Sequence, residues 1–280
     1  MFMCMLWDPA DKIEMEATKE YKWNEKELQE FRTTVLKEQL KCRTDDIFLL
    51  SFLRARKYDR ERALKLLKNY YSARKKYKDV FKDLRPSALQ TCLQTGLMSY
   101  KVLETGQIVG FGRVSHWDPT KVKLIDILRS VILLVDMELN DHPLQVNGVY
   151  VLIDVKTLSW RHFIQVNPRL LYLIVSSLYQ CIPLTYKGVH IVNVNKYLHA
   201  IAAMAFPFLP YKLKQRLHFH GSNMENLHKE IDPKCLPAEF GGDLPPFDES
   251  ESNQKLRDME EFFIENEKYW TEEEISEARN

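Results

Sequence analysis

The fold is decided by Gly188-Val189-His190-Ile191-Val192-Asn193-Val194, a run of strand length, and by the apolar segment after it, Tyr197-Leu198-His199-Ala200-Ile201-Ala202-Ala203-Met204-Ala205-Phe206-Pro207-Phe208-Leu209-Pro210. The first run predicts a buried strand. The second carries no formal charge from Tyr197 to Leu209, and at about a dozen residues it is too short to span a bilayer, which needs roughly 20. Two interpretations are open: a helix buried on nearly every side, or a lid that covers an apolar cavity and meets a membrane when it opens.

Strand and helix patterns alternate ahead of this stretch. Residues 102–104 and 108–114 predict a strand pair, and Gly148 to Asp154 form a continuous apolar run typical of a parallel strand covered on both faces. Helical spacing follows Asp118-Pro119-Thr120 and again follows Pro168. Residues 215–220 could add a short strand. This order predicts an α/β fold with a mostly parallel sheet.

Both ends of the chain are expected to be helical. Residues 1–85 predict an all-helical N-terminal module, with Asp45 and Asp59 as helix caps and Pro86 at its end. We assign residues 86–247 to the α/β domain and residues 248–280 to an acidic amphipathic C-terminal helix or tail. The stretch 41–85 has a net charge of +9 and the tail has −8, but we expect most of these charges to lie on solvated helix faces.

Composition indicates a protein of the cytoplasm. The overall net charge of +1 predicts no partner. Five scattered cysteines without a CxxC pair favour reduced thiols, and no run reaches transmembrane length. The apolar start, Met1 to Trp7, is too short for a secretory signal.

The usual catalytic motifs are missing from the sequence. There is neither a Gly-x-Ser-x-Gly elbow nor a phosphate-binding loop. Asp154 follows a strand, where catalytic carboxylates often lie, but a structural role in the next turn is at least as good an interpretation. His218 and His220 share one side of a strand, with His228 and Cys235 nearby in sequence, yet their spacing fits no standard zinc pattern. We therefore predict no enzyme and no metal site.

Several ordered motifs resemble the CRAL-TRIO lipid-transfer family. They are residues 45–58 (DDIFLLSFLRARKY), residues 116–119 (HWDP), residues 148–154, residues 183–188 (PLTYKG), residues 212–221 and residues 236–242 (LPAEFGG). The resemblance runs from about residue 25 to residue 247. Within the family, the sequence most resembles the α-tocopherol transfer protein group, which is itself similar to the retinaldehyde-binding proteins. It implies a helical module followed by a domain that holds one lipid in a closed apolar cavity under a mobile helical gate.

The resemblance also implies which residues act. On this view the gate is the apolar segment, with Leu198, Ile201, Ala202, Met204, Ala205, Phe208 and Leu209 as its apolar residues. A basic cluster for phosphatidylinositol bisphosphate head groups would comprise Lys187, Lys212, Lys214 and Arg216. Thr185 stands where the tocopherol proteins have a further basic residue, and so one charge is lost.

The cavity wall departs further from the tocopherol proteins. The matching positions are Gly112, Leu128, Val131, Ile132, Val135, Val149, Ile153, Ile174, Ser177, Leu178 and Leu184. Val131 and Val135 replace expected serines, and Gly112 replaces an expected tyrosine. A buried ligand hydroxyl left without a partner costs about 1–3 kcal/mol. A less polar or longer ligand than vitamin E, such as a retinoid, carotenoid or sterol-like lipid, is therefore plausible beside tocopherol.

We expect an intracellular lipid carrier that needs no cofactor besides its bound hydrophobic ligand. It would be cytoplasmic and would visit anionic, phosphoinositide-containing organelle or endosomal membranes transiently. The alternative is a phosphoinositide-sensing adaptor that transfers no cargo. Nucleic-acid binding is disfavoured, because Tyr70 and Tyr77 of the basic stretch lie on an apolar helical stripe.

Overall fold

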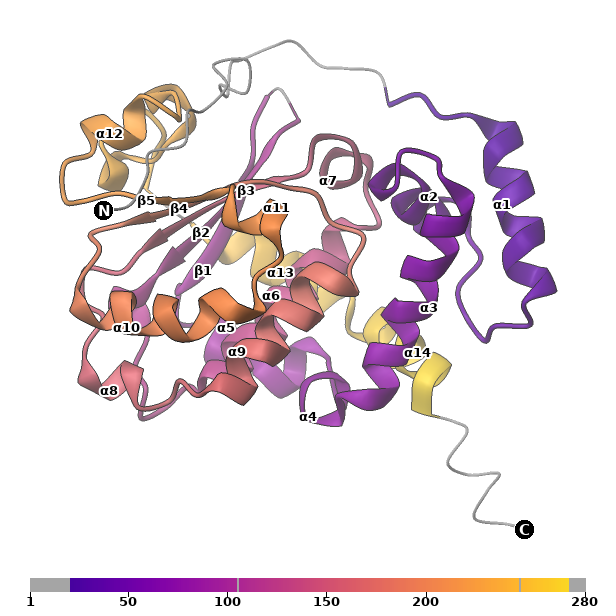
Figure 1. The fold of residues 1–280 in the computed structure, drawn as a ribbon, viewed down its shortest axis with the longest axis horizontal. Helices are drawn as coiled ribbons and strands as arrows, with labels where there is room; N and C mark the ends of the chain where they lie inside the picture. Colours follow the sequence, from indigo (N-terminus) through magenta and orange to yellow (C-terminus); the bar gives the residue numbers. More distant parts are fainter. Residues whose placement is uncertain (1–20, 105, 247, 272–280) are drawn as a thin grey trace.

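The computed structural model describes residues 21–104, 106–246 and 248–271 (Figure 1). The predictions for Met1 to Trp7 lie outside the described residues. Three helices form the N-terminal part: α1 (Glu25–Lys37), α2 (Asp46–Ala55) and α3 (Arg60–Lys76). The side chains of Asp45 and Asp59 accept hydrogen bonds from the amides of Phe48 and Arg62, so both act as helix caps.

The sheet has five strands in the order β1-β2-β3-β4-β5. They are β1 (Met98–Val102), β2 (Ile108–Arg113), β3 (Val149–Asp154), β4 (Tyr186–Val192) and β5 (Leu217–Phe219). Only the β1–β2 pair is antiparallel, and the other three pairs are parallel. The structure confirms the predicted α/β fold with a mostly parallel sheet.

Helices cover the sheet on both sides. The α-helices that follow α3 are α4 (Lys78–Phe81), α5 (Gln90–Leu93), α6 (Leu124–Glu138), α7 (His142–Asn147), α8 (Trp160–Phe163), α9 (Pro168–Val175), α10 (Lys196–Ala205), α11 (Tyr211–Lys214), α12 (Glu225–His228), α13 (Ser250–Asp258) and α14 (Glu260–Thr271). Short helical turns join them: η2 (Pro86–Leu89), η3 (Val114–His116), the π-helical η4 (Ser176–Gln180), η5 (Phe206–Phe208), η6 (Pro233–Cys235) and η7 (Ala238–Phe240). In Figure 1, α12 lies above the strands, and α6, α9 and α10 lie below them.

The start of α6 differs from the expected one. The helix begins at Leu124 rather than directly after Asp118-Pro119-Thr120. The carboxylate of Asp118 accepts hydrogen bonds from the amide and the hydroxyl of Thr120 and so closes a local turn. Aspartate often competes with helix formation in this way.

Alternate strand residues face opposite layers. The front face carries Ile108, Val149, Val151, Ile153, Val189 and Ile191, which pack toward α6, α9 and α10. The back face carries Val109, Phe111, Tyr150, Leu152, His190 and Val192, and it packs toward α12 and residues 231–240.

A buried ion pair joins the N-terminal helices to α6. Arg74 of α3 donates to both carboxylate oxygens of Asp136 at 2.7 and 2.9 Å. The two side chains are only 0 % and 3 % exposed. The guanidinium of Arg74 also lies 3.3 Å from the ring centroid of Tyr70. Since a buried charge without its partner is costly, this pair ties the two parts of the chain together.

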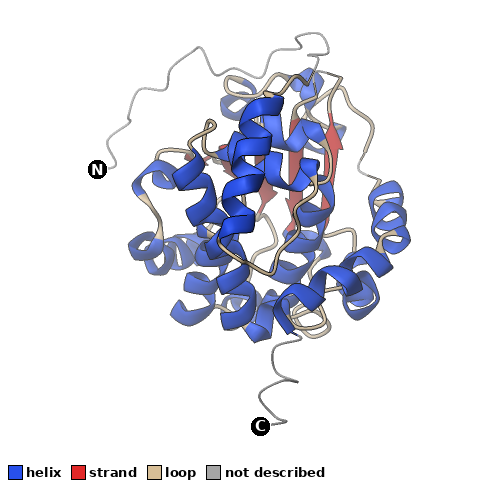
Figure 2. Cartoon of the chain, turned by 90° about the vertical axis from the view of Figure 1, so that its right-hand side faces the viewer, coloured by secondary structure: helices blue, strands red, loops and turns tan. Residues whose placement is uncertain are grey.

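The acidic C-terminal segment packs back onto the rest of the chain. Leu256 of α13 and Phe263 of α14 are buried in the same core as α6. Tyr269 and Trp270 pack against the core of α1–α3, where α14 lies beside α3 (Figure 1). Helices enclose the strands when the molecule is turned by 90° (Figure 2). Within the described residues, no helix combines the length and apolarity that crossing a membrane requires.

Candidate functional site: the front face and α10

The predicted wall positions gather on the front face of the sheet and the helices opposite it. Leu128, Ile132, Val149 and Ser177 are buried. The others are half-buried: Gly112, Val131, Val135, Ile153, Ile174, Leu178 and Leu184. They come from β2, α6, β3, α9, η4 and the segment before β4. The structure thus brings these elements together, and the ligand-binding role of the residues stays a prediction.

Apolar packing on the front face is divided into two clusters. Val149 and Val151 belong to a cluster with α6, α9 and η4. Ile153, two residues further along the same strand, belongs to a separate cluster with Val189 and α10. Neighbouring apolar side chains on one face normally join one contiguous core. The division, together with the half-buried side chains at its border, is what an unfilled apolar space between α6, α9 and α10 would produce.

Two glycines of β2 lie on this face. Gly110 and Gly112 of β2 pair with Val151 and Ile153 of β3. A Cβ atom added to Gly112 would meet only Ile153, at an ordinary distance of 3.6 Å or more. Position 112 therefore accepts a Cβ atom without a close contact.

The predicted gate segment forms α10 and η5. Asn195 caps α10 by accepting hydrogen bonds from the amides of Tyr197 and Leu198. Leu198 is buried against Val155, Leu158 and Ile191. The other predicted gate residues are half-buried: Ile201, Ala202, Met204, Ala205, Phe208 and Leu209. The helix is therefore fixed at its first turn and less completely buried along the rest of its length.

One wall residue has an unused polar group. Ser177 is fully buried, and its hydroxyl has no hydrogen-bond partner among the described residues. It is the only polar side chain in the predicted wall. It lies in η4, which is π-helical, and single π-helical turns are frequent at functional sites.

The predicted basic cluster lies beside the gate. Lys212 and Lys214 extend from α11, shortly after η5, and Lys187 is the second residue of β4. All three lysines are exposed, while Arg216 is half-buried and donates to the carbonyl of Tyr186. Among the described residues, no carboxylate forms an ion pair with any of the four. Their charges are therefore available to an anionic partner.

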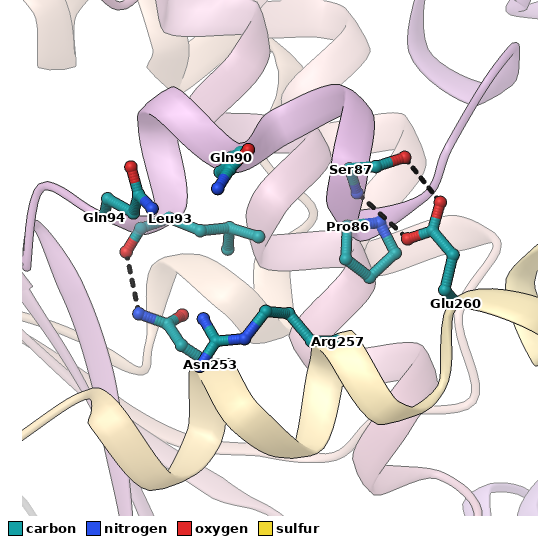
Figure 3. A pocket seen from close by; sticks show the side chains of 8 residues that line it. All are labelled: Pro86, Ser87, Gln90, Leu93, Gln94, Asn253, Arg257 and Glu260. Atoms are coloured by element: carbon teal, nitrogen blue, oxygen red, sulfur yellow. Dashed lines mark hydrogen bonds between the residues drawn. The ribbon is translucent and has the colours of Figure 1, made fainter.

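A separate surface pocket lies away from the predicted wall. It has a volume of about 270 Å³ and lies between η2, α5 and the two C-terminal helices (Figure 3). Its lining includes Ser87, Gln90, Asn253, Arg257 and Glu260. Asn253 and Glu260 hydrogen-bond to the chain across it. It shares no residue with the predicted wall, so it is not the expected lipid cavity.

The polar residues weighed as catalytic or zinc-binding have other contacts. Asp154 Oδ1 accepts hydrogen bonds from the Lys156 amide and the Asn193 side chain, both at 2.8 Å, which is a structural role. His228 Nε2 lies 2.8 Å from the Phe240 carbonyl, and Cys235 is buried in the back-face core. His218 and His220 do lie on one side of the sheet, with parallel rings.

Sequence reasoning missed residues on both faces. Val151 and Val189 are half-buried on the front face, and strand alternation around Val149 and Ile153 could have identified them. On the back face, His190 stacks against both His218 and His220, and Glu230 lies beside them. His190 interrupts an otherwise apolar strand, which was the only signal available from the sequence.

Comparison with known proteins agrees with this architecture. The CRAL/TRIO domain matches residues 104–242. Clavesin-1 of Xenopus laevis is 37% identical over 212 residues, which is 74% of this chain and 63% of that protein. Clavesin-2 of Homo sapiens is 35% identical over 224 residues, which is 78% of this chain and 68% of that protein. The crystal structure of Sfh5 aligns with a TM-score of 0.53, covering 87% of this chain and 99% of that one, and at 12% identity this likeness shows the fold alone.

The likeness to Clavesin-2, over 224 residues, covers more of the chain than the domain match at residues 104–242. The narrower resemblance to the α-tocopherol transfer protein group stays a prediction. The matched domain, the extent of the likeness to Clavesin-2 and the architecture of the sheet agree. The chain belongs to the CRAL-TRIO lipid-transfer family.

Proposed function

We propose that the protein binds one hydrophobic lipid between the front face and α10 and exchanges it at phosphoinositide-containing membranes. The observation that carries this proposal is the division of the front-face packing into two clusters with half-buried apolar side chains between them. A lipid placed there would contact α6, β3 and α10 together and would join the two clusters into one core.

The size of the apolar contact makes a gate necessary. Burying roughly 400 Å² of ligand apolar surface at about 25 cal/mol/Å² contributes on the order of 10 kcal/mol before opposing terms. Such a ligand leaves into water very slowly, so exchange requires a path directly into a membrane. The α10–η5 segment suits this path because it is apolar, is fixed mainly through Leu198 and leads into the basic cluster.

Ser177 suggests that the ligand has one hydrogen-bonding group. A buried hydroxyl without a partner costs about 1–3 kcal/mol, which a hydroxyl or carbonyl on the ligand would recover. A tocopherol, a retinoid or a similar lipid has such a group at one end of a long apolar body.

The basic cluster would hold the protein at the membrane. Each basic residue near an anionic surface contributes about 1 kcal/mol, and arginine can bind a phosphate through two hydrogen bonds. We expect Lys212→Ala with Arg216→Ala to slow lipid transfer to vesicles containing phosphatidylinositol bisphosphate and to leave equilibrium lipid binding unchanged. Transfer can be followed as the loss of fluorescence when a labelled lipid reaches quencher-loaded vesicles.

Two further variants make this experiment specific. Because Arg216 also donates to the Tyr186 carbonyl, Lys187→Ala with Lys212→Ala tests charge without touching that contact. Lys101→Ala with Lys156→Ala removes two exposed charges elsewhere and serves as the control. Equal transfer rates for all variants and the wild type would refute the membrane role of the cluster.

The second candidate is a phosphoinositide-sensing adaptor that carries no cargo. The exposed basic cluster favours it as much as it favours a carrier, but the divided front face does not. We propose no reaction for the site, since Asp154 is held in structural hydrogen bonds. A cytoplasmic carrier that visits organelle or endosomal membranes transiently fits the proposed exchange.

A further inference from the structure

Four polar side chains form a compact cluster on the back face, away from the proposed lipid site. His190 of β4 stacks on His218 of β5 and on His220, with ring centroids 4.7 and 5.4 Å away and planes within 13°. Glu230, just after α12, reaches the same place, and its Oε2 lies 2.8 Å from His218 Nδ1. Three separate segments of the chain therefore converge at one point.

Two spacings between the candidate ligand atoms match a tetrahedral metal ion. His190 Nδ1 lies 3.2 Å from His220 Nε2 and 3.4 Å from Glu230 Oε2. Two ligand atoms bound to tetrahedral zinc at about 2.0–2.1 Å would lie about 3.3–3.4 Å apart. One ligand atom from each of His190, His220 and Glu230 can be chosen so that all lie within 4.8 Å of one another. Metal binding would therefore require the widest of these spacings to shorten.

One buried carboxylate oxygen of the cluster lies beside two histidine nitrogens. Glu230 Oε2 is buried and accepts no well-aligned hydrogen bond from any described residue, although His218 Nδ1 lies nearby. A buried carboxylate oxygen in this state is costly, and a cation would satisfy it.

The protein holds the ligands in position. A Cβ atom at Gly188 would lie 2.6 Å from His190 Nε2, so glycine is required there to leave room for the imidazole ring. With Nε2 turned toward Gly188, the Nδ1 atom of His190 faces the cluster.

We propose that His190, His220 and Glu230 bind one transition-metal dication of the zinc type on the back face. Two imidazoles with one carboxylate suit such an ion better than Ca²⁺ or Mg²⁺, which prefer oxygen ligands. His218 positions the Glu230 carboxylate from outside the ligand set, as residues behind metal ligands commonly do. The ion would reach the site past Glu230 and His218, whose side chains are 24% and 20% exposed.

A bound ion would join β5 to the rest of the domain. This strand has only three residues, and the ion would connect it to β4 and to the segment after α12. Because the site lies on the opposite face from α10, metal binding does not depend on the proposed lipid function.

The test is a Co²⁺ titration of tag-free, chelator-treated full-length protein, followed by the visible d–d absorption that tetrahedral coordination produces. We expect one Co²⁺ per chain, displaced by one Zn²⁺, and a higher melting temperature with Zn²⁺ present. Glu230→Gln keeps the size of the side chain and should weaken binding at least about tenfold, as should His220→Asn.

His116→Asn is the matched control, because His116 is exposed and has no place in the cluster. It should bind Co²⁺ as the wild type does. Circular dichroism of each variant checks that it is folded, and Glu230→Gln, at a partly exposed position, keeps the test valid if His220→Asn fails to fold. The proposal is overturned if the wild type gives no tetrahedral Co²⁺ spectrum, or if Glu230→Gln binds with unchanged affinity.

Discussion

The front and back faces of the sheet use alternate residues of the same strands, yet they are packed in different ways. On β3, Leu152 faces back and is completely buried, whereas Val151 and Ile153 face front and are half-buried. The back face forms one continuous core with Leu227, Ile231 and Phe240. The front face forms two separate clusters.

The comparison indicates that the two faces of one sheet have different roles, stability on the back face and ligand binding on the front face. Close-packed interiors give a protein stability, and space left in an apolar layer reduces it. The apolar space that we propose on the front face alone is therefore more easily explained by a ligand than by poor packing in general. The complete packing of the back face would supply stability that the front face gives up.

The largest expected effect comes from the ion pair behind the front wall. Arg74→Met leaves the Asp136 carboxylate buried without its cation, so we expect a loss of about 3–5 kcal/mol in the free energy of unfolding. Asp136 lies on α6, and hydrogen exchange should increase more on the front-face helices than in back-face segments. Urea denaturation and hydrogen-exchange mass spectrometry measure the two effects.

The exposed pair of Arg169 and Asp79 provides the control for this variant, with side chains 80% and 68% exposed. Arg169→Met should leave the free energy of unfolding nearly unchanged, since exposed pairs contribute little. A similar small loss for Arg74→Met would mean that the N-terminal helices are not anchored to α6 through this pair.

Neighbouring residues of β3 test the comparison itself. Leu152→Ala should cost about 2–5 kcal/mol, because it opens a cavity in a filled core. Ile153→Ala in ligand-free protein should cost less, under about 2 kcal/mol, because its side chain is already half-accessible. Equal losses in urea denaturation would contradict the difference in packing between the two faces.

Much of the scaffold could be predicted from local sequence. The caps Asp45 and Asp59 and the apolar runs of β3 and β4 depend on residues close together in the chain, and the structure confirms them. The predicted start of α6 was wrong because Asp118 closes a turn with Thr120. Turns and helix starts favour the same residue types, so the sequence does not distinguish them.

Features built from distant segments could not be predicted in this way. The Arg74–Asp136 pair joins residues 62 positions apart, and the histidine cluster depends on β4 pairing with β5. No local periodicity records such contacts. The division of the front-face packing is equally invisible in sequence, because a filled and an unfilled apolar face have the same alternation.

A smaller effect on membrane binding is expected at position 185, where threonine replaces the basic residue of the tocopherol proteins. Thr185→Lys should strengthen binding to phosphatidylinositol bisphosphate vesicles by about 1 kcal/mol, roughly fivefold. The hydrogen bond from the Val149 amide goes to the backbone carbonyl of Thr185 and is kept. Vesicle sedimentation at two salt concentrations measures the change. A gain that does not diminish at high salt would show that added charge is not its cause.

The central claim is that the front face holds one hydrophobic ligand, and it is tested most directly by mass spectrometry of organic extracts from the purified protein. Gly112→Phe, which should fill the space beside Ile153, is the matched variant, and Gly112→Ala, which adds one methyl group at an ordinary contact distance, is its control. We predict one apolar lipid at near one-to-one stoichiometry in the wild type and in Gly112→Ala, and its loss in Gly112→Phe. Bulk phospholipid alone, at equal amounts in all three proteins, would contradict the claim.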